Sequence, residues 1–90
     1  MKHLEIVVFG RVQGVFYRAS AQAKANELGI IGTVQNQSDG TVLIHAQGPE
    51  EYLEEFIEWC KEGPKHASVT NLEIKEMPVE DFVGFKVKRF

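Results

Sequence analysis

Apolar and polar positions alternate at the start of the chain. Between residues 3 and 9, every second position is apolar, and these positions are Leu4, Ile6 and Val8. The positions between them include Val7 and Phe9, so the second face is also partly apolar. A period of two with two apolar faces is typical of a strand inside a sheet. The pattern predicts a central strand.

Small residues mark the next segment, from about Phe16 to Leu28, and Gly29 follows it. Apolar residues recur there at intervals of three or four positions, which predicts an amphipathic helix that ends at the glycine. Because the stripe is rich in alanine, we expect this helix to pack close to the sheet. The stripe consists of Tyr17, Ala21, Ala25 and Leu28.

Two short β-prone runs, residues 30–36 and 41–47, come next, separated by a turn with Asp39 and Gly40. Asp-Gly favours a tight turn because glycine adopts positive φ without strain. The runs therefore predict a hairpin. After it, Pro49 suits a first helical turn, and Gly63 with Pro64 ends the helix. The apolar stripe of this second helix is Leu53, Phe56, Ile57 and Cys60.

Two more strands are predicted, at residues 69–77 and 84–90. Their inward positions are Leu72, Ile74, Phe85 and Val87. The resulting order, βαββαβ with a short terminal strand, fits an α+β fold of the ferredoxin-like, split βαβ type. We therefore expect an antiparallel sheet with two helices on one face.

Length and charge limit the class of protein. The chain has 90 residues, of which 43% are hydrophobic, and this suits one domain spanning residues 1–90. Lys and Arg number 10, Asp and Glu 13, and the formal charge is −3, which disfavours nucleic acid as a partner. No apolar run approaches the roughly 18 residues of a membrane span. We expect a soluble, cytoplasmic monomer that binds neither membrane nor nucleic acid.

The residues that most often bind metals or react as nucleophiles are sparse. Cys60 is the single cysteine and lies on a predicted apolar stripe, which indicates a buried, inert thiol. His3, His45 and His66 lack the spacing of zinc motifs. The sequence therefore indicates no metal site.

A turn with Gly10 and Gly14 joins the first strand to the first helix, and Arg18 follows within that helix. Backbone N–H groups at a helix N-terminus bind anions, and an arginine fork binds two phosphate or carboxylate oxygens at once. The turn therefore suggests a phosphate cradle. A plain strand-to-helix connection with a solvated Arg18 fits the same spacing, because neither common phosphate-loop motif is present.

Two separated motifs carry a family resemblance. "GRVQGVFYR", residues 10–18, and "GTVQNQSDG", residues 32–40, resemble the paired motifs of the acylphosphatases, and the rest of the chain has their length and element order. The resemblance implies hydrolysis of the carboxyl–phosphate bond of acyl phosphates, without metal or organic cofactor. It implies that Arg18 binds the phosphate and that Asn36 positions the attacking water. It also implies a phosphate loop formed by Arg11, Val12, Gln13, Gly14, Val15 and Phe16.

Some features depart from the family pattern or favour other functions. Thr33 stands where many members carry tryptophan, and Phe16 with Tyr17 replaces a Cys-Phe pair of some animal members. Asn36 also fits a strand-end residue that starts a hairpin. A short last strand would bring the Phe90 carboxylate near Arg18. The alternatives are an anion-binding regulatory module without turnover and, on the basic-aromatic tail "GFKVKRF", an RNA-binding domain.

Overall fold

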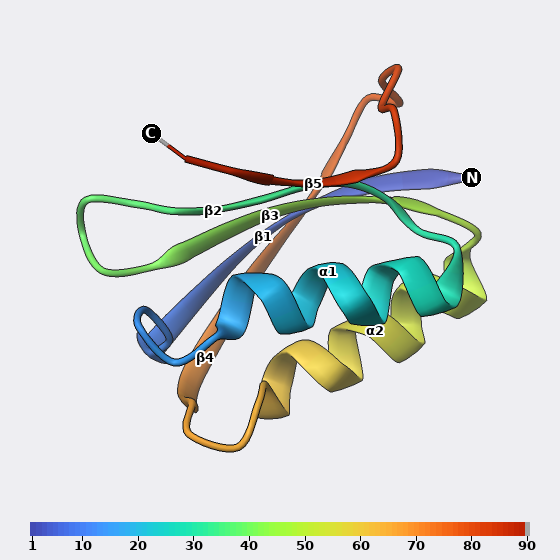
Figure 1. Ribbon diagram of the computed structural model, residues 1–90. Helices are drawn as coiled ribbons and strands as arrows, with labels where there is room; N and C mark the ends of the chain where they lie inside the picture. The colour runs from blue at the N-terminus through green and yellow to red at the C-terminus, as the bar shows by residue number, and fades with distance from the viewer. Residues whose placement is uncertain (90) are drawn as a thin grey trace.

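The computed structural model describes residues 1–89 as one five-stranded sheet with two helices on one of its faces (Figure 1). The elements in chain order are β1 (Lys2–Arg11), α1 (Tyr17–Leu28), β2 (Ile31–Asn36), β3 (Val42–Gly48), α2 (Glu50–Glu62), β4 (Ser68–Met77) and β5 (Phe85–Lys88). This confirms the predicted fold class, including the hairpin of β2 with β3 and the short last strand. The predicted position of the Phe90 carboxylate lies outside the described residues.

The strands lie in the order β4-β1-β3-β2-β5, so β1 is internal, as predicted. All neighbours pair antiparallel except β2 and β5, which pair parallel. The sheet is therefore mixed rather than antiparallel throughout. After β4 at one edge, residues 78–84 cross the open face to the other edge, and the returning chain necessarily runs in the direction of β2 (Figure 1).

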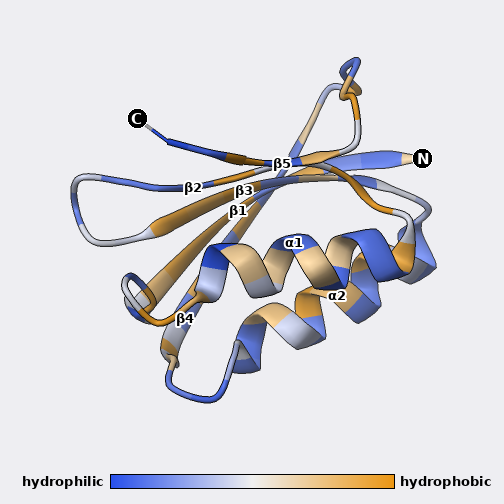
Figure 2. Ribbon diagram, in the orientation of Figure 1, coloured by the Kyte–Doolittle hydropathy of each residue, from blue (hydrophilic) through white to orange (hydrophobic). Residues whose placement is uncertain are grey.

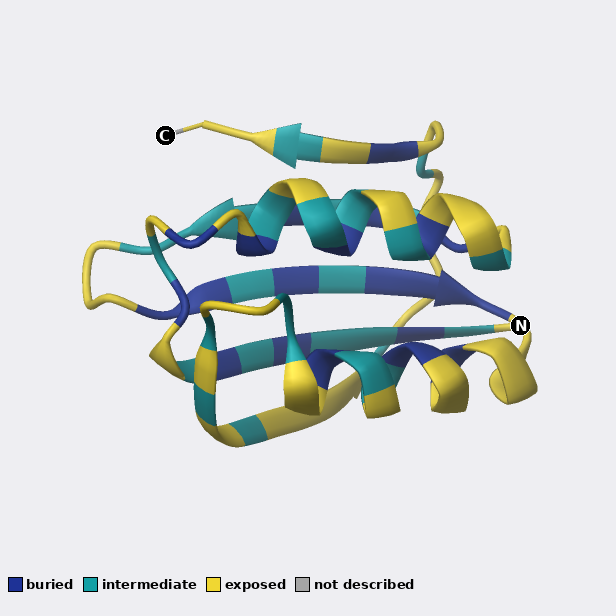
Figure 3. Cartoon of the chain, turned by 60° about the horizontal axis from the view of Figure 1, so that its bottom comes forward, coloured by how far each residue is buried: buried dark blue, intermediate teal, exposed yellow. Residues whose placement is uncertain are grey.

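The core lies between the sheet and the helices. Hydrophobic residues concentrate along β1 and β3, whereas polar residues cover the outer turns of α2 (Figure 2). Buried residues likewise lie along the central strands and on the sides of the helices that face the sheet, and exposed residues lie on the outer sides of the helices (Figure 3). Tyr17, Ala21 and Ala25 of α1 and Leu53, Phe56 and Cys60 of α2 are buried, which confirms both predicted stripes, whereas Leu28 and Ile57 are only partly buried.

Three local predictions need correction. Helix α2 begins at Glu50, because Pro49 has an extended backbone (ψ 143°) and occupies the cap position before it. Helix α1 begins at Tyr17, because Phe16 has a left-handed backbone. Ile74 pairs with Ile6 of β1, so its side chain lies on the helix-facing side of the sheet as predicted, but it is 45% exposed. Its strand, β4, is an edge strand, so no further strand covers its outer flank.

None of the helices in residues 1–89 is long and apolar enough to cross a membrane.

Candidate active site

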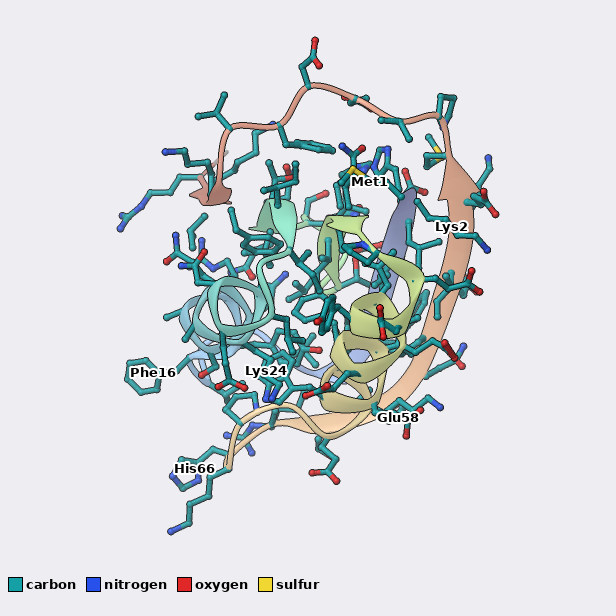
Figure 4. The ribbon with its side chains drawn as sticks, turned by 90° about the vertical axis from the view of Figure 1, so that its right-hand side faces the viewer. Met1, Lys2, Phe16, Lys24, Glu58 and His66 are labelled. Carbon is teal, nitrogen blue, oxygen red and sulfur yellow. The ribbon has the colours of Figure 1, made fainter. Side chains whose placement is uncertain are left out.

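The loop between β1 and α1 reverses the chain over a few residues, and its backbone is unusual. Gly14 has φ 73° and Phe16 has φ 62°, both in the left-handed region, and Phe16 is the only non-glycine residue with positive φ among residues 1–89. The Phe16 side chain is 79% exposed and points away from the body of the protein (Figure 4). The buried side chains of Val12 and Val15 anchor the loop to the core.

Gln13 ties this loop to the hairpin of β2 and β3. Its side-chain amide donates hydrogen bonds to the carbonyl oxygens of Gln37 and Thr41, each 2.8 Å long. The hairpin turn itself is closed by Asp39, whose carboxylate accepts hydrogen bonds from the backbone N–H and the hydroxyl of Thr41. These hydrogen bonds lower the pKa of Asp39. The loop and the hairpin are thus held against each other by side-chain contacts.

Arg18 lies on the first turn of α1, and the residue before it fixes that turn in place. Tyr17 is buried, and its hydroxyl donates a hydrogen bond of 2.8 Å to the Cys60 carbonyl of α2. Burial raises the pKa of Tyr17 well above its usual value, and the neighbouring Cys60 adds to the effect. The hydroxyl therefore stays protonated and anchors the start of the helix that carries Arg18.

Asn36 is the last residue of β2 and shares the helix-facing side of the sheet with the buried Val34. Its side-chain oxygen Oδ1 is buried and accepts no hydrogen bond from any residue that the structure describes. Buried polar atoms are nearly always paired, and an unpaired one is costly. Among residues 1–89, Asn36 therefore carries an unused acceptor position inside the fold.

A pocket of about 340 Å³ brings the loop, Arg18 and Asn36 together. Five of the predicted site residues line it, namely Arg18, Asn36, Val12, Gly14 and Phe16. The other three residues of the predicted loop do not line it, and these are Arg11, Gln13 and Val15. The remaining lining residues are Tyr17, Ala19, Val87 and Arg89.

Two of these lining residues, Val87 and Arg89, come from β5 and the residue after it. Neither residue lies in the two motifs, so neither was predicted as a site residue. Their alternation with the buried Phe85 indicates that they share the helix-facing side of the sheet. What could not be read from the sequence is that β5 pairs with β2, the strand of Asn36.

Thr33, which departs from the family pattern, lies on the opposite face of β2, where it pairs with His45 and Lys86. It does not line the pocket.

The fold also assembles histidines far from this pocket. His3 is fully buried, its Nδ1 donates to the Pro78 carbonyl at 2.7 Å, and its Nε2 lies 2.8 Å from Nδ1 of His45. Phe82 packs edge-on against the His3 ring. No group of three or more His, Cys, Asp or Glu side chains suited to a metal occurs within residues 1–89.

Cys60 is buried, as predicted, and burial raises the pKa of its thiol to about 12. The thiol is therefore protonated near neutral pH and is a poor nucleophile.

Comparison with known proteins identifies the family. The Acylphosphatase family model matches residues 4–87. The acylphosphatase of Methylococcus capsulatus is 48% identical over 90 residues, covering 99% of this chain and 98% of that protein. The crystal structure of acylphosphatase from Bacillus subtilis superimposes with a TM-score of 0.95 at 37% identity, covering 98% of this chain and 99% of that one. T. kodakarensis HypF, at 36% identity and a TM-score of 0.87, matches over all of this chain but only 12% of its own.

The family model spans nearly the whole chain, and the relative and the solved structure each match almost all of it. All three indicate the family that the two sequence motifs suggested, and residues of both motifs line the pocket. The chain therefore belongs to the acylphosphatase family.

Proposed function

We propose that Arg18 and the backbone of the loop of residues 11–16, of which Val12, Gly14 and Phe16 line the pocket, bind the phosphoryl group of an acyl phosphate there, while Asn36 positions the water that attacks phosphorus. As an acylphosphatase, the chain hydrolyses the carboxyl–phosphate bond, and the products are a carboxylate and inorganic phosphate. The observation that carries the proposal is the convergence of Arg18, Asn36 and the loop on one pocket, although they come from separate elements.

Positioning and charge stabilisation dominate phosphoryl transfer. The loop precedes the N-terminus of α1, where backbone N–H groups carry partial positive charge. Arg18 adds a permanent positive charge and a planar fork of donors. Together these groups would meet the negative charge on the equatorial oxygens of the phosphoryl group during in-line transfer. The site thus supplies its positive charge without drawing on a metal ion.

Asn36 cannot act as a general base because its amide is neutral at ordinary pH. Its free Oδ1 would instead accept a hydrogen bond from the attacking water and hold it in line with the scissile bond. The proton of that water then passes to a phosphate oxygen of the substrate. The leaving carboxylate is weakly basic, so it departs without a general acid, and no catalytic histidine or carboxyl pair is required.

The test is turnover of benzoyl phosphate in the presence of a metal chelator, by the native chain and two variants. Arg18→Ala should weaken inhibition by inorganic phosphate and lower kcat/KM by about 10²–10³, the usual cost of one charge-stabilising donor. Asn36→Ala should lower kcat by a similar factor, about 10²–10³, while inhibition by phosphate stays within about twofold, because the water and not the phosphoryl group loses its partner.

Asn71→Ala is the matched control, since Asn71 is exposed on β4 and does not line the pocket. Its kinetics should equal those of the native chain. The proposed roles would be wrong if Arg18→Ala or Asn36→Ala, folded as judged by circular dichroism, kept native kcat/KM.

The resemblance to a small part of a HypF solved in a phosphate- and nucleotide-bound form, at 27% identity and a TM-score of 0.85, raises one alternative, an anion-binding module without turnover. A folded native chain that binds inorganic phosphate but leaves benzoyl phosphate intact would support that module and contradict our proposal.

A further inference from the structure

Arg89 follows β5, and the pairing of β5 with β2 places it beside Asn36. The register joins Gly32 to Phe85 and Val34 to Val87. One further step of the same kind along both strands brings Asn36 level with Arg89, and both residues line the pocket. Figure 1 shows the end of β5, the hairpin and the start of α1 at the same side of the molecule.

Two hydrogen bonds to backbone carbonyl oxygens hold the start of β5 in this register. The Gly32 N–H donates to the Gly84 carbonyl at 2.9 Å, just before β5 begins. The side-chain amide of Gln22, on α1, donates to the Phe85 carbonyl at 2.8 Å. Because β5 is tied both to β2 and to α1, its register is fixed, and this register places the backbone of Arg89 beside Asn36.

The chemistry of the site indicates which part of a substrate Arg89 meets. If Asn36 holds the attacking water, in-line transfer puts the leaving carboxylate on the opposite side of phosphorus. A group at the level of Asn36 then faces the water and the phosphoryl oxygens rather than the acyl group. A guanidinium there would pair with those oxygens, as proposed for Arg18.

We propose that Arg89 is a second arginine that binds the phosphoryl group, so that Arg18 and Arg89 hold it from two elements of the fold. This inference rests on the proposed function of Arg18 and Asn36. Arg89 is exposed whereas Arg18 is half-buried, so solvent screens the attraction between Arg89 and a bound phosphoryl group more strongly. Its removal should therefore cost less than the removal of Arg18.

The test compares Arg89→Gln with Lys88→Gln. Lys88 is the matched control, because it is the neighbouring cation and its side chain points to the opposite face of the same strand. Two substrates are used, benzoyl phosphate and 4-carboxybenzoyl phosphate, which share the phosphoryl group but differ in the charge of the acyl group. Binding of inorganic phosphate is measured separately by calorimetry.

Arg89→Gln should lower kcat/KM by on the order of tenfold for both substrates and weaken phosphate binding by a similar factor. Arg89→Lys should recover part of the loss, and added guanidinium should partly restore Arg89→Gln. Lys88→Gln should stay within about twofold of the native chain throughout, since surface charges away from a site have small effects.

The proposal would be overturned by native kinetics in folded Arg89→Gln, by a loss confined to 4-carboxybenzoyl phosphate, or by unchanged phosphate binding. The first result removes Arg89 from the site, and the second assigns it to the acyl group. Since calorimetry requires no turnover, a native chain that fails to hydrolyse either substrate would contradict the proposed function yet still report whether Arg89 binds phosphate.

Discussion

Replacing Gln13 with alanine should separate the positioning of the phosphate loop from its chemistry. Gln13 does not line the pocket, yet its amide joins the loop to the hairpin that carries Asn36. Gln13→Ala removes both contacts and leaves the carbonyl oxygens of Gln37 and Thr41 without this donor. The loop would then be free to shift relative to Asn36.

The size of the effect follows from the two hydrogen bonds, both partly buried and 2.8 Å long. Each neutral hydrogen bond contributes about 1 kcal/mol to stability, so the free energy of unfolding should fall by about 2 kcal/mol. For a domain of this size that lowers Tm by about 10 °C. Because displacements near 1 Å can cost about 10²-fold in rate, kcat should fall by at least about tenfold.

Gln47→Ala is a matched control for this experiment. The Gln47 amide also makes two hydrogen bonds with backbone, both to Glu80, but at the connection between β4 and β5, and Gln47 does not line the pocket. Thermal denaturation and benzoyl phosphate kinetics are measured for both variants. Both should lose similar stability, and only Gln13→Ala should lose kcat. Equal kcat losses in the two variants, or native kcat in Gln13→Ala, would refute a positioning role.

Three further predictions concern stability. Burial and the nearby His3 hold the pKa of His45 below its usual value, so the folded state binds a proton less readily than the unfolded one. The contribution of neutral His45 to the free energy of unfolding should be fully present above about pH 6.5 and be lost as the pH drops through the lowered pKa. Urea midpoints measured from pH 8 to 5 should therefore depend less on pH in His45→Gln than in the native chain. Gly10→Ala should lower the free energy of unfolding by about 3 kcal/mol or more, and Gly14→Ala by about 1 kcal/mol, because a Cβ at Gly10 would collide with the β4 backbone whereas a Cβ at Gly14 has space. Equal urea midpoints for the two variants would contradict this. Phe16→Gly should raise Tm by a few degrees, roughly 1 kcal/mol, by relieving the left-handed backbone of an exposed side chain, and a lower Tm would count against that strain.

Local chemistry explains why much of the fold could be predicted from the sequence. The two-residue period of β1 and the stripes of α1 and α2 record which faces are buried, and burial is what holds these elements in place. The turn at Asp39 and Gly40 has its own hydrogen bonds, so the hairpin is encoded within a few residues. Glycine at the ends of both helices likewise provides the positive φ that terminates them.

Long-range pairing explains what could not be predicted. The parallel pairing of β5 with β2 depends on a crossing of the open face by residues 78–84, and no local pattern specifies its partner strand. The exposure of Ile74 depends on β4 lying at an edge. The contact of His3 with His45 depends on the register of β1 with β3. For the site, the two motifs indicated Arg18 and Asn36, whereas Arg89 follows only from the register.

The last strand has different roles on its two faces. On the helix side, Phe85 is buried and Val87 partly buried, and Arg89 continues this row into the pocket. On the other side, Lys86 and Lys88 are exposed at the edge of the sheet, where charged side chains discourage pairing with a further strand. Alternation therefore separates the two roles by one residue, so a one-residue slip of β5 would place Arg89 on the open face and bury a lysine. The register that protects the core is thus the same one that presents Arg89 to the site.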